Sequence, residues 1–122
     1  MASLLSKAKK TTSKRISEIR PGTYDSIVTA VGTPTGYKDG EAFMITYNLK
    51  GGKTSSKYTK TEIYFNDDRN PRTRGFVEYL KKSDPTIENW ADLVGMKEKL
   101  TLQYEVNGKK YLNIVEREFI GR

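Results

Sequence analysis

A stretch that mixes aromatic and basic side chains, residues 35–60 and the strand that follows, is where this sequence could best do chemistry. Flat aromatic rings can stack on nucleobases, and ammonium groups can neutralise phosphates. The candidate residues in and beside this stretch are Tyr37, Lys38, Tyr47, Lys53, Lys57, Tyr58, Lys60 and Tyr64. Their types and spacing predict a surface that binds single-stranded nucleic acid.

Further candidates lie later in the chain. Arg72 can bind phosphate, but it can equally pair with a nearby aspartate or lie on the first turn of a helix. Lys109, Lys110 and Tyr111 follow Asn107-Gly108, a strong hairpin signal, and we expect them to flank the same surface.

Strand periodicity assigns the rings to faces. Ile63 and Phe65 alternate with Tyr64, so an inward-facing apolar pair would turn Tyr64 outward and make it the favoured stacking residue. Tyr47 shares a strand face with Ile45 and Leu49, so both a core role and a binding role stay open for it. The aromatic residues expected in the core or in helix packing are Tyr24, Phe76, Tyr79, Trp90 and Tyr104.

The chain contains no Cys and no His. This excludes cysteine nucleophiles, disulfides, zinc fingers and Ser-His-Asp triads. Asp67, Asp68 and Glu62 could hold Mg²⁺, but the aspartates lie in an ordinary turn sequence with no accompanying general base. We therefore expect no enzymatic activity, no metal site and no cofactor.

Charge is distributed unevenly along the 122 residues. Residues 1–20 contain six basic side chains and only Glu18 as an acid, so most of the net charge of +7 lies there. We expect residues 1–20 to form a basic flexible arm, with one domain over residues 21–122. A basic arm favours a polyanionic partner, although a solubilising tail has the same composition. No apolar run is long enough to cross a membrane, and no signal peptide is recognisable, so a cytoplasmic location is expected.

Hydrophobic periodicity predicts five strands and a helical segment. The strands are expected over residues 23–31, 42–49, 58–65, 97–106 and 109–119, a helix over 72–82 and a second short helix over 86–94. This order predicts an all-β protein with a helical insert, a five-stranded OB-fold barrel. An SH3-like barrel and a helix packed on an open antiparallel sheet are the alternatives.

Several segments resemble small phage-encoded single-stranded DNA-binding proteins of the OB class. These are Pro21-Gly22-Thr23-Tyr24, the second strand, the helix Gly75-Phe76-Val77-Glu78-Tyr79-Leu80, and Leu93-Val94-Gly95 leading to Leu100–Val106 and Tyr111-Leu112-Asn113-Ile114. The resemblance covers about residues 20–119 and is a pattern of elements without a distinctive motif. It implies DNA as the ligand. Bacterial replication proteins of this class end in an acidic tail, whereas this sequence ends Glu118-Phe119-Ile120-Gly121-Arg122.

Two functions follow from these observations. The first is sequence-independent binding of single-stranded DNA, with RNA as a possible ligand, to protect it in phage replication or recombination. The second is a protein-interaction or structural module of a virion or its assembly, since small β-barrels host many functions. A homodimer or higher homo-oligomer is compatible with both.

Overall fold

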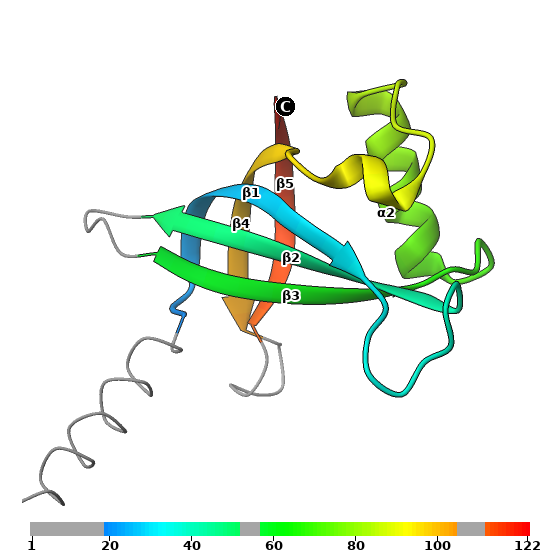
Figure 1. The fold of residues 1–122 in the computed structure, drawn as a ribbon. Coiled ribbons are helices and arrows are strands. Elements are labelled where there is room, and N and C mark those ends of the chain that lie inside the picture. The colour runs from blue at the N-terminus through cyan, green and yellow to red at the C-terminus, as the bar shows by residue number, and fades with distance from the viewer. Residues whose placement is uncertain (1–18, 52–56, 105–111) are drawn as a thin grey trace, which may run out of the picture.

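A computed structural model describes residues 19–51, 57–104 and 112–122. The elements in chain order are β1 (Gly22–Gly32), β2 (Ala42–Gly51), β3 (Lys57–Phe65), α2 (Pro71–Ser83), the 3-10 helix η1 (Trp90–Leu93), β4 (Lys97–Tyr104) and β5 (Leu112–Gly121). All five strands belong to one antiparallel sheet in the order β3-β2-β1-β4-β5. The protein is therefore mostly β, with α2 between β3 and β4, as the periodicity predicts (Figure 1).

The sheet is strongly curved. Figure 1 shows β1 bending so that its second half runs with β2 and β3 across the β4–β5 pair. The pairing of β1 with β2 shifts register between Val28 and Ala30, and such bulges increase local bending. No backbone ladder joins β3 to β5 among the described residues, so these two strands are the edges of the sheet.

Helix α2 begins and ends where local chemistry dictates. The Asn70 side chain accepts hydrogen bonds from the backbone N–H groups of Arg72 and Thr73, and Pro71 occupies the first turn, where its missing N–H costs nothing. At the other end Lys81 and Lys82 favour the negative end of the helix dipole.

The second predicted helix, residues 86–94, is wrong in length, because only η1 forms there. Asp84 accepts hydrogen bonds from the backbone and hydroxyl of Thr86, and Asp92 accepts from the backbone N–H groups of Glu88 and Asn89. Such side-chain bonds to nearby backbone compete with the helical ladder.

The core lies between the inner face of the curved sheet, α2 and η1. Its fully buried members include Val28, Ile45, Leu49, Leu93, Met96, Leu100 and Leu102. Ile19 also packs against this core, and the Tyr24 hydroxyl donates to the Arg20 carbonyl. The described fold therefore includes residues 19 and 20, which were assigned to the arm, while the rest of the predicted arm lies outside the described residues.

The first turn of α2 is fixed to the outer edge of β3. Arg72 donates from Nη1 to the Ile63 carbonyl, and Thr73 donates from Oγ1 to the Phe65 carbonyl at 2.8 Å. Two carbonyls of an otherwise unpaired strand edge are thus satisfied by helix side chains.

Candidate nucleic-acid interface

The outer face of β2 and β3 is defined by the strand register. Residues paired directly across two antiparallel strands point to the same side of the sheet. The outward pairs are Met44 with Ile63, Thr46 with Thr61, Asn48 with Thr59, and Lys50 with Lys57, and Phe65 follows on the same side. This set, which we call the β2–β3 face, contains two lysines and no acidic side chain.

An exposed aromatic pair stands at one end of the β2–β3 face. The Phe65 side chain is 44% exposed and Tyr37, in the loop between β1 and β2, is 37% exposed. Their ring centroids lie 5.8 Å apart with the planes inclined at 63°. Each ring therefore keeps a surface in contact with solvent while the other supports its edge. The predicted exposure of Tyr37 is confirmed, and Lys38 beside it is exposed too.

An open cavity of about 550 Å³ adjoins this pair. Its polar lining residues are already engaged within the protein. Glu41 accepts from the Lys38 backbone, and Arg69 forms a two-pronged ion pair with Asp67. Asn66 donates to the Gly40 carbonyl and accepts from Trp90. The aromatic end therefore offers ring surface beside polar groups that are partly engaged within the protein.

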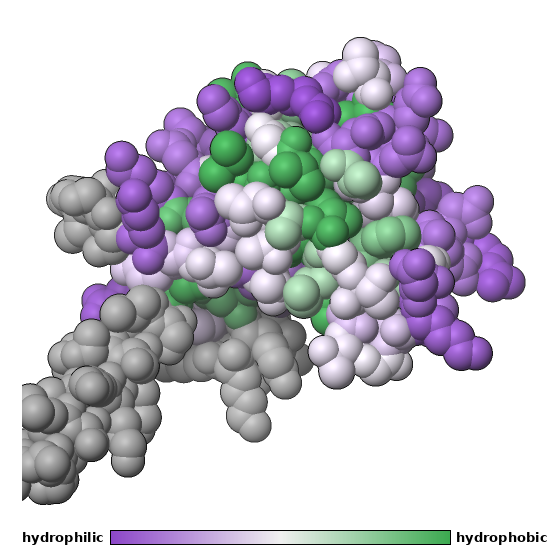
Figure 2. Space-filling view, in the orientation of Figure 1, coloured by the Kyte–Doolittle hydropathy of each residue, from purple (hydrophilic) through white to green (hydrophobic). Residues whose placement is uncertain are grey.

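Figure 2 shows how hydrophobic and hydrophilic residues are distributed on the side of the molecule seen in Figure 1. Apolar and weakly polar residues gather over the middle of the view, and hydrophilic residues surround them on both sides. A ligand with flat apolar rings and a charged backbone matches such a surface.

The predicted orientation of Tyr64 is wrong. Tyr64 is buried, whereas Ile63 and Phe65 are exposed. The Tyr64 ring stacks on the Phe76 ring of α2, with centroids 4.4 Å apart. The Arg72 guanidinium lies 4.0 Å from the centre of the Tyr64 ring. The strand is therefore in the opposite phase to the one expected, because the helix covers the face that carries Tyr64.

Tyr47 is also buried, with no exposed surface, which corrects its placement among the binding candidates. Its hydroxyl accepts a hydrogen bond from Arg117 of β5. Burial raises the pKa of both Tyr47 and Tyr64 well above the ordinary value, so both hydroxyls are protonated over the usual pH range.

Arg117 organises a buried polar cluster on the inner face. It donates to both carboxylate oxygens of Glu98 at 3.1 and 2.9 Å, and to the Tyr64 hydroxyl at 2.6 Å. Its guanidinium also lies 4.5 Å from the centre of the Phe76 ring. The Tyr79 hydroxyl is buried beside this cluster without a hydrogen-bond partner among the described residues, and burial raises its pKa.

Other predicted residues lie on the inner face or at the seam between β3, α2 and β5. Lys60 forms an ion pair with Glu62 at 2.8 Å, and each of these side chains is only 14% exposed. Arg72 pairs with the same Glu62 rather than with the aspartates that follow β3. Tyr58 is half-buried, with its ring edge against Tyr24. None of these three extends the outer surface as expected.

Lys57 is exposed on the outer surface, where the sequence predicts it. Lys53, Lys109, Lys110 and Tyr111 lie outside the described residues. The core assignments hold for Tyr24 and Phe76, and Tyr79 and Trp90 pack against the core. Tyr104 was assigned to the core and is instead 41% exposed.

Four exposed residues of the outer face were not among the site residues predicted from the sequence. They are Ile63 and Phe65 on β3, and Lys97 and Lys99 on β4. The alternation of Lys97 and Lys99 with Leu100 and Leu102 already indicated that both lysines point outward. For Phe65, strand alternation alone allows the side chain to point inward or outward. The outward orientation is the less expected of the two, because large apolar side chains are usually buried.

The acidic residues considered for Mg²⁺ do not converge. Glu62 is held by Lys60 and Arg72, whereas Asp67 is held by Arg69, which lowers the pKa of that carboxyl through hydrogen bonds. In the described part of the chain, no group of three or more acidic, His or Cys side chains is arranged to hold a metal ion.

Comparisons of the chain with protein-family models, curated proteins and solved structures gave no match. Within residues 19–51, 57–104 and 112–122, no helix is long and apolar enough to cross a membrane.

Proposed function

We propose that this protein binds single-stranded DNA without catalysing a reaction, using the β2–β3 face of an OB-fold. The observation that carries the proposal is the β2–β3 face, which combines exposed Phe65, supported by Tyr37, with two lysines and no acidic residue of its own strands. Protection of single strands in phage replication or recombination is the role that fits such a surface and the resemblance described above.

The strand order supports the OB assignment. An OB-fold is a partly open five-stranded barrel whose β2–β3 region and adjoining loops bind oligonucleotides. Here the order β3-β2-β1-β4-β5 would become a barrel if β3 met β5, and α2 occupies the connection from β3 to β4. The 2.6 Å hydrogen bond from Arg117 of β5 to Tyr64 of β3 bridges that seam with side chains.

The pleat of the sheet separates charge in a way that suits a polyanion. Glu62 of β3 and Glu98 of β4 both point inward, where Lys60, Arg72 and Arg117 neutralise them. Lys50 and Lys57 point outward and lie opposite each other. Phosphates approaching the outer face of β2 and β3 therefore meet two cations, with Asp25 of β1 as the neighbouring carboxylate.

The aromatic end favours binding without strong sequence preference. Base-edge recognition needs donors and acceptors that are free and held in place, whereas Asn66 uses its amide within the protein and Arg69 and Glu41 are engaged in part. Stacking on Phe65 and Tyr37 accepts any base, because every base has a π-face.

A binding titration with fluorescently labelled oligo-dT tests the proposal. The full chain should bind the single strand, with affinity that falls steeply as salt rises, and should bind the matching duplex much more weakly. Phe65→Ala should weaken binding by about 1–3 kcal/mol, the usual contribution of one stacked base.

Val115→Ala is the matched control, because Val115 is 48% exposed but lies on β5 beside α2, away from the β2–β3 face. It should bind like the unaltered protein. Equal affinity for single strand and duplex, or no effect of Phe65→Ala, would contradict the stacking mechanism. Tighter binding of oligo-U would replace DNA with RNA as the ligand, and a lack of binding to all three would favour a protein-interaction module.

A further inference from the structure

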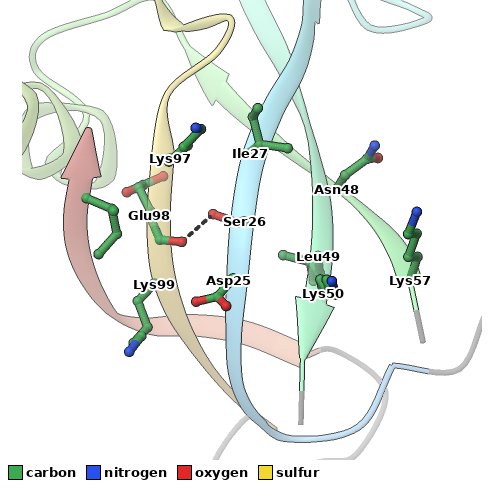
Figure 3. Close-up of a pocket in the computed structure, with 11 residues that line it drawn as sticks. Asp25, Ser26, Ile27, Asn48, Leu49, Lys50, Lys57, Lys97, Glu98 and Lys99 are labelled. Atoms are coloured by element: carbon green, nitrogen blue, oxygen red, sulfur yellow. Dashed lines mark hydrogen bonds between the residues drawn. The ribbon is translucent and has the colours of Figure 1, made fainter. Parts of the chain in front are cut away.

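A second surface, distinct from the aromatic pair, joins the β2–β3 face at its basic end. It is an open groove of about 580 Å³ that crosses the outer side of β3, β2, β1 and β4. Figure 3 shows side chains from these four strands lining it, with β1 in the middle. The lysines at its rim are Lys50, Lys57, Lys97 and Lys99.

The register places these lysines in two neighbouring rows across the sheet. In the first row Lys57 lies opposite Lys50, Lys50 opposite Asp25, and Asp25 opposite Lys99. In the second row Asn48 lies opposite Ile27, and Ile27 opposite Lys97. With a strand spacing of about 4.8 Å, the first row spans about 14 Å from Lys57 to Lys99.

One part of this arrangement, the Lys50–Lys57 pair, is unfavourable for the fold itself. Like charges directly opposite each other on antiparallel strands are destabilising, and Lys50 and Lys57 are such a pair. None of the four lysines has a carboxylate oxygen within 4.0 Å in the described part of the chain. Asp25, opposite both Lys50 and Lys99, and Glu118, opposite Lys99, offset part of this repulsion, but the Lys50–Lys57 pair has no acidic residue opposite it on β2 or β3. Uncompensated positive charge of this kind is typical of a functional site.

The floor of the groove differs from its rim. Half-buried Ile27 of β1 supplies apolar surface between the lysines, and exposed Ile120 of β5 adds apolar surface beyond Lys97 and Lys99. Sugars and bases can lie on such a floor while phosphates reach the ammonium groups around it. An acidic protein segment would match the rim equally well, but the apolar floor and the continuity with the β2–β3 face favour a nucleic acid.

We infer that a single strand bound to the β2–β3 face continues across the sheet through this four-lysine groove, and that Lys97 and Lys99 on β4 bind its phosphates. This inference rests on the proposed function and specifies the path of the ligand. The bound nucleic acid turns at Lys50 and Lys57, which belong to both surfaces. Its route then runs perpendicular to the β-strands.

Salt dependence measures the phosphate contacts directly. For single strands, each neutralised phosphate adds about 0.7 to the slope of log Kobs against log salt concentration. The double variant Lys97→Gln/Lys99→Gln should therefore lower the steepness of that slope by about 1.4 in titrations of the full chain with oligo-dT. Lys81→Gln/Lys82→Gln, at the exposed end of α2, removes the same charge and should leave the slope unchanged.

A variant that is expected to tighten binding, and not to weaken it, excludes misfolding as an explanation. Asp25 lies between Lys50 and Lys99, where it reduces their mutual repulsion but also opposes an approaching phosphate. Asp25→Asn should therefore tighten binding, by up to about fivefold for a water-screened contact near 4 Å. A damaged fold would weaken binding instead.

Four results would overturn the inference, and each points to a different error. If both double variants change the slope equally, or if Asp25→Asn does not tighten binding, the path is wrong while the Phe65→Ala result still tests the proposed function. If the full chain does not bind oligo-dT, the proposed function and the path both fail. If poly-glutamate binds through Lys97 and Lys99 while oligo-dT does not, the groove belongs to an acidic protein segment.

Discussion

The buried ion pair between Arg117 and Glu98 makes a quantitative prediction about stability. The Glu98 side chain has no exposed surface, and both of its carboxylate oxygens accept hydrogen bonds from Arg117 and from no other described residue. Arg117→Met keeps the length of the side chain but leaves that carboxylate buried and unpaired. Breaking a buried pair in this way costs about 3–5 kcal/mol.

This cost is large relative to the whole fold. Domains of about this size have free energies of unfolding of roughly 5–15 kcal/mol. Arg117→Met should therefore shift the urea unfolding midpoint, followed by circular dichroism, far below that of the unaltered protein. The loss of the guanidinium over the Phe76 ring adds to the effect.

The reciprocal variant should be milder. After Glu98→Met, Arg117 keeps the hydroxyls of Tyr47 and Tyr64 as partners and the Phe76 ring beneath it. The double variant should lose less free energy than the two single variants together, because neither charge is left alone. A cost below about 1 kcal/mol for Arg117→Met, or strict additivity of the two changes, would refute this account of the cluster.

Three further predictions concern other parts of the fold. Burial raises the pKa of Tyr47 and Tyr64 above the unfolded value near 10, so their contribution to stability is present below about pH 10 and is lost as the pH rises further. The urea unfolding midpoint should therefore be lower at about pH 10.5 than at about pH 8. Equal midpoints at the two pH values would argue against the burial of these hydroxyls. Asn70→Ala removes the cap of α2 and should cost about 1 kcal/mol in urea unfolding, whereas Asn48→Ala on the outer face of β2 should cost little. A Cβ on Gly51 would lie 2.1 Å from the Tyr24 ring, so Gly51→Ala should destabilise by about 1–3 kcal/mol, while Gly32→Ala, with nothing within 4 Å, should not; equal thermal midpoints would contradict this packing.

The order and limits of the elements were largely predictable from local patterns. Strand β2 starts at Ala42 and β3 ends at Phe65 as expected, because turn residues flank both. Helix α2 is one residue longer at each end than predicted, since Pro71 is compatible with a first turn. These signals depend on neighbours in sequence, which is why they can be recognised without the tertiary structure.

The inner face of β3 was not predictable in the same way. Its phase depends on Arg117, which lies far along the chain and is buried against Tyr64 and Tyr47. Arginine is rarely buried, and β5 changes its pairing with β4 between Thr101 and Leu102, so the alternation before this irregularity does not extend to Arg117. Tyr64 was therefore assigned to the wrong side of the strand, whereas the exposure of Tyr37 and Lys57 agrees with the prediction.

The anchoring of α2 on β3 has a consequence for association between molecules. Arg72 and Thr73 occupy the carbonyls of Ile63 and Phe65, so an incoming strand would have to displace two helix side chains to pair there. In the described part of β5, no side chain caps a backbone carbonyl in this way, and Val115 is exposed beside it. Sheet growth from one molecule into another is therefore directed to the β5 margin, one strand away from Lys97 and Lys99 of β4.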